Sequence, residues 1–402
     1  MATDIADTAR PVTANAVLDL LPARPRLLAL GEPAHGEETL LELRNDLFRE
    51  LVEQAGHRTI AIESDCLKAQ AVDAYVTSGT GTLDDAMERG FGHGWGAFPG
   101  NRALVRWMRA HNEGRPASEQ VRFAGFDGPL EITAAASPRQ ALIALHTYLA
   151  ARVNADLLPC TADTLDRLLG EDGQWTEPEA MPDPIRSVGR SAQADRLRLL
   201  ADDLVELLDE QTPHLIAASS RQDWDRARLH GRTATGLLRY HHWMADTSPG
   251  RMARLLGVRD TMMAANLLAL AEHGPVLASG HNGHFQRHEG TMALWQGPVR
   301  WWSAGAQVSA HLGEGYAFLA TAVGTLRHRG VDAPAPDTVE GMLYALPGDR
   351  RLVDPAALTA ALAGTEPAAR VSPWFGYSPL DPDHLSGTDA LLFVRDAARH
   401  RP

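Results

Sequence analysis

The sequence contains little of what secreted, membrane or nucleic-acid-binding proteins need. Its 402 residues include only two cysteines, Cys66 and Cys160, which excludes a disulfide framework and fits a reducing cytoplasm. Residues 1–25 lack a basic start followed by an apolar segment, so we expect no secretion signal. No apolar run approaches the roughly 18 residues that a membrane span requires, and the net charge of -13 argues against a nucleic-acid partner. These absences predict a cytoplasmic protein without a membrane or nucleic-acid partner.

Several common catalytic motifs are also missing. The chain has no G-x-S-x-G elbow, which argues against the usual serine hydrolases. It has no phosphate-binding G-x-x-x-x-G-K-[ST] loop, and no G-x-G-x-x-G follows its first apolar run. Cys66 lies close to Glu63 and Asp65, whose charges raise the pKa of a thiol, so we do not expect a nucleophilic cysteine.

Short apolar runs that end in polar residues dominate the rest of the pattern. Such runs are typical of strands that are covered on both faces of a sheet. Residues 37–55, between the first two runs, have apolar residues at helical spacing, so the order is strand, helix, strand and indicates a parallel sheet. The runs lie at residues 26–30, 59–62, 121–126 and 275–279, with later candidates at 299–303, 316–322 and 390–394.

The middle of the chain differs, because residues 139–242 have mostly helical periodicity, clearest at 194–209. We therefore predict an α/β fold: a central, mostly parallel sheet flanked by helices, with an appended helical section that covers the active-site cleft. The expected division is 1–138 for the first part of the α/β core, 139–245 for the helical insertion or lid, and 246–402 for the second part of the core.

Two histidine clusters are the strongest functional signals. Gly-Glu-Pro-Ala-His-Gly occupies 31–36 and Gly-His-Asn-Gly-His occupies 280–284, each directly after an apolar run. Histidine takes and gives protons near neutral pH, and α/β folds place their sites at the ends of strands. Within the first cluster, Glu32 is close enough to orient the imidazole of His35.

Glu63 ends the second predicted strand, where a carboxylate needs a partner. Arg44, on the predicted helix 37–55, is a candidate for that partner, in a structural salt bridge or in a charge network that fixes the histidine. His281, His284, His35 and Glu63 would also make a plausible zinc set, although the spacing alone is a weak signal. His93, in Gly-His-Gly-Trp-Gly, is either in a substrate-lining loop or in a flexible surface turn.

Taken together, these residues resemble the erythromycin esterase family. The resemblance rests on Gly-Glu-x-x-His-Gly, on Glu63, on Phe-x-Gly-Phe-Asp at 123–127, on Arg-Asp followed by Met-Ala-x-Asn at 259–266, and on His-Asn-x-His at 281–284. Residues 388–393 are similar to the closing strand of the family. The order and spacing agree over roughly 26–130 and 255–325 and are much weaker over 139–242, which we expect to shape substrate choice.

The resemblance implies metal-independent hydrolysis of a macrolactone ester without a cofactor. Carried onto this sequence, it makes His35 the general base that activates water, with Glu32 beside it. Arg44, Glu63, His281 and His284 complete the expected catalytic set, and His281 or His284 would stabilise the oxyanion or protonate the leaving alkoxide. The expected substrate-binding residues are His93, Trp95 and Asp127.

Three alternatives stay open from the sequence. The same site could belong to a tailoring enzyme of natural-product biosynthesis that catalyses elimination, cyclisation or acyl transfer. It could belong to a metal-dependent hydrolase. A histidine-rich cleft could also bind a ligand or a haem without turnover.

Overall fold

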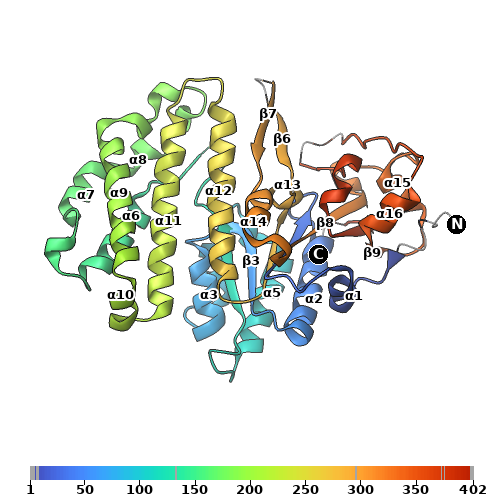
Figure 1. Ribbon diagram of the computed structural model, residues 1–402, viewed down its shortest axis with the longest axis horizontal. Coiled ribbons are helices and arrows are strands. Elements are labelled where there is room, and N and C mark those ends of the chain that lie inside the picture. Colours follow the sequence, from blue (N-terminus) through green and yellow to red (C-terminus); the bar gives the residue numbers. More distant parts are fainter. Residues whose placement is uncertain are drawn as a thin grey trace.

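The computed structural model describes residue 5 and residues 9–131, 134–294, 297–372, 374 and 376–398. Its centre is an eight-stranded sheet in which the short strand at residues 350–353 runs antiparallel to both of its neighbours and every other adjacent pair is parallel. The predicted α/β class, with a mostly parallel sheet flanked by helices, is therefore confirmed (Figure 1). Across the sheet, the strands are β1 (Ala9–Arg10), β9 (Arg350–Val353), β10 (Ala390–Asp396), β8 (Tyr316–Thr325), β2 (Leu27–Glu32), β5 (Val276–His281), β3 (Thr59–Asp65) and β4 (Arg122–Asp127).

The central strands are apolar throughout because both faces of the sheet are covered. Alternate residues of β2 enter two different cores: Leu28 and Leu30 face one, and Leu27 and Ala29 face the other. The first core is closed by α1 (Ala14–Leu20), α2 (Glu38–Ala55), α3 (Ala69–Ser78), α4 (Leu83–Arg89) and α5 (Pro99–Asn112). The second is closed by α12 (Arg251–Ala271), α13 (Asn282–Phe285), α14 (Ala304–Leu312), α15 (Val339–Ala345) and α16 (Pro355–Ala361).

The predicted helical section is a bundle beside the β3–β4 edge of the sheet, drawn in green to yellow in Figure 1. It has its own apolar core, which also contains Cys66 and Leu67 from the end of β3. This shared packing and the packing of α11 on α12 join the bundle to the sheet, so the division into three domains stays a prediction. The helices of the bundle are α6 (Arg139–Ala150), α7 (Ala162–Leu169), α8 (Asp172–Trp175), α9 (Ala192–Glu210), α10 (Thr212–Ala218) and α11 (Arg221–Met244).

One predicted strand lies outside the central sheet. The run at 299–303 falls largely in β7 (Gly297–Trp302), which pairs only with β6 (Glu289–Leu294) in an antiparallel ribbon. The ribbon projects from the body of the molecule beside α12 (Figure 1). Its residues alternate between partly covered and exposed, as expected for a ribbon with one packed face.

Helices of membrane-spanning length and apolarity are absent from the part of the chain that the structure describes.

Candidate active site

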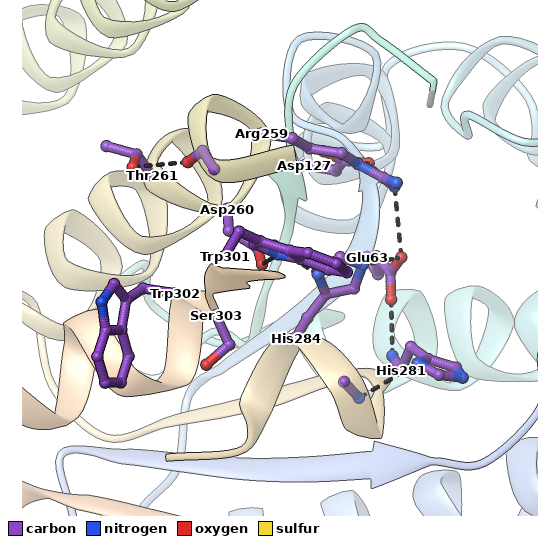
Figure 2. Close-up of polar contacts among 12 residues, drawn as sticks. Glu63, Asp127, Arg259, Asp260, Thr261, His281, His284, Trp301, Trp302 and Ser303 are labelled. Carbon is purple, nitrogen blue, oxygen red and sulfur yellow. Dashed lines mark hydrogen bonds and ion pairs between the residues drawn. The ribbon is translucent and has the colours of Figure 1, made fainter. Parts of the chain in front are cut away.

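The two histidine clusters meet at the carboxyl edge of the sheet. Glu32 at the end of β2 is in register with His281 at the end of β5, and Ile62 of β3 is in register with Ser279 of β5. Because β5 lies between β2 and β3, Glu63 reaches both clusters. Figure 2 shows Glu63 between the His281 backbone on one side and Arg259 and His284 on the other.

His35 forms a carboxylate–imidazole dyad with Glu32. Its Nδ1–H donates to Glu32 Oε1 at 2.7 Å, and its Nε2 lies 3.7 Å from Glu63 Oε1. The side chain is 39% exposed and lies beside the buried carboxylate of Glu63. Burial would lower the pKa of His35, but the charge of Glu63 and the hydrogen bond and charge of Glu32 outweigh it, so the pKa is raised above 6.5.

The loop that carries His35 requires a glycine. Gly36 has φ +77°, and a Cβ at this position would lie 2.7 Å from the Phe98 ring. This turn leads into α2, at whose N-cap the buried Glu37 pairs with His328 and Arg329. These ion pairs connect the start of α2 to the C-terminal part of the chain.

Glu63 contacts residues from three different elements of the site. Its Oε2 accepts the His281 backbone N–H at 2.6 Å, while Oε1 lies 3.3 Å from His284 Nε2 and 3.5 Å from Arg259 Nη2. Burial raises the pKa of this carboxyl, but the positive charges of His284, His35 and Arg259 hold it well below its usual range. Gly280 is needed beside it, because a Cβ there would lie 2.7 Å from Glu63 Oε2.

His284 forms a second dyad that mirrors the first. Its Nδ1–H donates to Asp260 Oδ1 at 2.5 Å, and Asp260 Oδ2 accepts the indole N–H of Trp301 at 2.5 Å (Figure 2). Despite burial, the charges of Asp260 and Glu63 raise the pKa of His284 to about 10, so the ring is a cation at neutral pH. His35 and His284 thus both direct Nε2 towards the same oxygen of Glu63.

His281 differs from both of these histidines. The Gly283 backbone N–H donates to its Nδ1 at 3.2 Å, and the ring is also hydrogen-bonded to the backbone of Pro33. Burial and the charge of His35 lower the pKa of His281 to about 3, so it is neutral over the physiological range. Its ring centroid lies 5.2 Å from that of His35.

The predicted substrate-binding residues lie beside this cluster. His93, at φ +55°, is held by Asp127 through Nε2 at 3.2 Å and by Glu131 through Nδ1 at 2.6 Å. Burial alone would lower the pKa of His93, but the two carboxylates have the larger effect and raise it to about 9. The Trp95 ring lies between His35 and His93, with centroid distances of 5.1 and 5.6 Å. Asp127 is fully buried and accepts hydrogen bonds from Arg259, the shortest at 2.6 Å.

Arg44 does not pair with Glu63, and this expectation was wrong. Arg44 points from α2 towards α5, where its Nη2 donates to Asn101 Oδ1 at 2.9 Å; it also donates twice to Asn45. Burial lowers its pKa to about 10, against the charges of Glu32 and Glu38. Because Asn101 Nδ2 donates to the Trp95 carbonyl at 2.9 Å, Arg44 supports the tryptophan loop. The cation beside Glu63 is Arg259.

The sequence-based site omitted three residues that the structure places in the cluster: Arg259, Asp260 and Glu131. The signal for the first two is the adjacent charged pair in the otherwise uncharged stretch 255–267, which entered the prediction only as part of the family pattern. Glu131 follows β4 in a loop and carries no comparable signal.

Cys66 is buried, and burial raises the pKa of its thiol to about 12, which agrees with the exclusion of a cysteine nucleophile.

The zinc set considered from the sequence has no counterpart in the geometry. Within the residues that the structure describes, no three histidine, cysteine, aspartate or glutamate side chains are grouped as metal ligands. Instead, His35 and His284 each donate a hydrogen bond from Nδ1–H to a carboxylate. His281 Nδ1 accepts a hydrogen bond from a backbone N–H.

Three solved structures are similar to this fold along nearly the whole chain. A protein from Bacillus cereus has a TM-score of 0.72 at 18% identity, with 99% of this chain and 98% of that chain covered. A succinoglycan biosynthesis protein has a TM-score of 0.71 at 14% identity, with 98% and 96% covered. A histidine mutant of the erythromycin esterase EreC in its open conformation has a TM-score of 0.67 at 19% identity, with 96% and 94% covered. A comparison with curated proteins gave no match.

The profile of the erythromycin esterase family matches residues 52–396. This segment contains Glu63, Arg259, Asp260, His281 and His284, whereas the Glu32–His35 dyad lies just before it. The match covers most of the sequence, and its family is the one that the histidine motifs indicated. The chain belongs to the erythromycin esterase family.

Proposed function

We propose that this protein is an ester hydrolase in which His35, oriented by Glu32, removes a proton from the attacking water. The observation that carries the proposal is the Glu32–His35 dyad, whose free nitrogen lies 3.7 Å from the buried carboxylate of Glu63 in a partly exposed site. With Nδ1–H bonded to Glu32, Nε2 is the nitrogen that accepts the proton.

The reaction needs one water and one ester bond. As His35 Nε2 takes a proton, the water oxygen bonds to the ester carbonyl carbon and the carbonyl oxygen becomes negatively charged. Collapse of this intermediate breaks the bond to the alcohol oxygen and leaves a carboxylic acid. The protonated His35 then gives its proton to the departing alkoxide, as a general base does when it reverses its role.

His284 and His281 have different roles in this scheme because they differ in charge. The cationic His284 has both nitrogens occupied by carboxylates, so it keeps Glu63 ionised and adds positive charge near the developing oxyanion. His281 is neutral, with a pKa of about 3, and its ring is hydrogen-bonded to the backbone of both Gly283 and Pro33, so it holds these two loops together at the site and brings no charge to the oxyanion. We assign the return of the proton to His35 rather than to either of these rings.

The substrate that we propose is a small natural product with an ester or macrolactone bond, in keeping with the family. The Trp95 ring, tilted by 50° to the rings of both His35 and His93, offers an aromatic wall beside the dyad for such a substrate. The helical bundle is connected to this wall, because the Tyr240 hydroxyl of α11 donates to the Glu131 carbonyl at 2.9 Å.

Turnover in H₂¹⁸O tests the reaction class. We expect hydrolysis of a macrolactone such as erythromycin to place one solvent oxygen in the product carboxylate, which mass spectrometry reads as a gain of one label per opened ester. An incubation without enzyme is the control for spontaneous hydrolysis. Labelling should be the same after treatment with a chelator.

A product that forms without solvent oxygen would contradict the proposal and favour elimination, cyclisation or acyl transfer. Activity that disappears with the chelator and returns with zinc would favour a metal-dependent hydrolase. Tight binding without any product, across macrolactones and smaller esters, would favour a ligand-binding protein.

A further inference from the structure

A cavity lies between α11 and α12, separate from the histidine cluster. Its volume is about 130 Å³, and residues of both helices line it. α12 directs Arg259 and Asp260 to the histidine cluster and presents Thr261 to the cavity, and Figure 2 shows Thr261 pointing away from Glu63. Nothing in the proposed ester hydrolysis uses this space.

Two arginines line the cavity without a counter-ion. Arg232 and Arg239 have no carboxylate within ion-pairing distance among the described residues, whereas Arg228 on the same helix pairs with Glu272 at 2.8 Å. Within the same described part of the chain, Arg232 donates only through Nε, to Asn266 Oδ1 at 3.3 Å, which leaves its two terminal nitrogens for another acceptor. Arg239 is exposed, but Arg232 is partly buried, and the carboxylates of Glu272 and Asp225 act on it only from beyond ion-pairing distance. A partly buried cation without an ion-pair partner is costly, and an anion bound against Arg232 would reduce that cost.

Arg232 keeps its charge at neutral pH. Burial and the neighbouring charge of Arg228 lower its pKa, but only to about 10. Hydroxyl groups of Thr233, Thr235 and Thr261 surround the cavity as well, although the last two already donate to carbonyls of their own helices. The threonine side chains therefore add polar surface, but among the described residues only the two guanidinium groups bring charge to the cavity.

The rest of the lining is apolar. Val258, Met262, Ala265 and Gly236 contribute most of it, and Gly236 keeps the two helices close because a Cβ there would lie 2.5 Å from the Met262 sulfur. An apolar cavity of about 150 Å³ accepts a benzene ring. This cavity is slightly smaller but is open on one side, so it has room for most of a phenyl ring while an attached carboxylate stays at the opening.

We propose that this cavity binds a small carboxylate with a compact apolar body. The carboxylate would lie against the guanidinium of Arg232, whose planar donors match its two oxygens, with Arg239 as a second cation. The apolar part would fill the space against Val258, Met262 and Ala265. The proposal does not depend on the ester hydrolase function.

Isothermal titration calorimetry of the full chain with sodium benzoate tests this site. We expect a Kd of about 1 mM, which is ordinary for a ligand of this size. Neutral benzamide should bind at least about 10-fold more weakly, because it lacks the charge that Arg232 recognises. Inorganic phosphate is a probe for the alternative that any anion is accepted, and binding as tight as that of benzoate would overturn the carboxylate assignment.

Variants locate the binding. Arg232→Met should weaken benzoate binding at least about 10-fold, since a charge-assisted hydrogen bond is lost. Arg226→Met is the matched control, because Arg226 is exposed on the same helix and pairs with Asp223 outside the cavity. Ala265→Leu fills the cavity without changing any charge and should also abolish benzoate binding. This variant locates the binding site even if Arg232→Met does not fold.

Two further results would overturn the proposal. One is the absence of benzoate binding to the wild-type protein at about ten times the expected Kd. The other is unchanged binding in folded Arg232→Met or in folded Ala265→Leu, with folding checked by circular dichroism.

Discussion

Arg259→Met is expected to lower the free energy of unfolding by about 3–5 kcal/mol at neutral pH. Arg259 is buried and contacts two buried carboxylates, Asp127 at 2.6 Å and Glu63 at 3.5 Å. Methionine fills similar space but leaves both negative charges without this cation. Urea unfolding followed by circular dichroism measures the effect.

The pH dependence identifies the cause of this loss. In the wild-type protein, the pKa values of Asp127 and Glu63 are held low, so their stabilising contribution is present above the pKa values of the unfolded chain and is lost as the pH falls through the folded ones. In the variant, both carboxyls take up protons at higher pH. The stability difference should therefore be largest at neutral pH and become smaller in acid.

Arg254→Met is the control, because Arg254 is exposed on the same helix and only stacks on Trp243. We expect it to change stability by less than about 1 kcal/mol. Equal losses in the two variants, or a loss for Arg259→Met that does not decrease in acid, would contradict the charge argument.

His35→Ala should reduce kcat by at least about 100-fold with the fold intact. A positioned general base contributes about 10²- to 10⁴-fold, and no other histidine in the cluster can take its place. His284 is already protonated at neutral pH, and His281 has a pKa of about 3 and a backbone N–H on its Nδ1. Because the His35 side chain is 39% exposed, its removal leaves no closed cavity.

Turnover of the variant is measured at saturating ester beside His311→Ala, which removes an exposed histidine on α14. We expect the control to keep wild-type turnover and both variants to keep wild-type circular dichroism. A folded His35→Ala protein with turnover within a few-fold of the control would exclude His35 as the base.

The sequence was sufficient to identify most residues of the histidine cluster but not to pair them. Apolar runs that end in Glu32, Glu63 and His281 are recognisable because strands covered on both faces contain almost no polar residues. Their common sheet edge follows from parallel strands. The strand order does not follow, because β5 lies between β2 and β3 although more than two hundred residues separate it from them in the chain.

The error over Arg44 has a similar origin. Arg44 and Arg259 are both helical arginines, and proximity in sequence favoured Arg44 as the partner of Glu63. The choice between them depends on which face of the sheet each helix covers: α2 lies on one face, and α12, which carries Arg259, lies on the other. Periodicity shows that a helix has an apolar side, but it does not show which neighbour that side meets.

Short or one-sided strands were missed for a different reason. β9 has four residues, two of them the consecutive arginines Arg350 and Arg351, and β1 has only two residues, so neither gives an apolar run. The strand predicted at 299–303 does exist, but its partner β6 contains exposed residues and follows a polar loop. Pairing within a ribbon depends on local register rather than on burial.

The pH dependence of kcat/KM, compared between the wild-type protein and Glu32→Gln on the same ester, tests the central claim most directly. A general base must be neutral, so we expect activity to rise with pH through the pKa of His35, which lies above 6.5 in the wild-type protein. Glutamine removes the charge of Glu32 and weakens the hydrogen bond, two of the effects that raise this pKa. The account therefore predicts that the rise moves to lower pH in Glu32→Gln. A rise at the same pH in both proteins, or at higher pH in the variant, would contradict the assignment of His35 as the base that activates water.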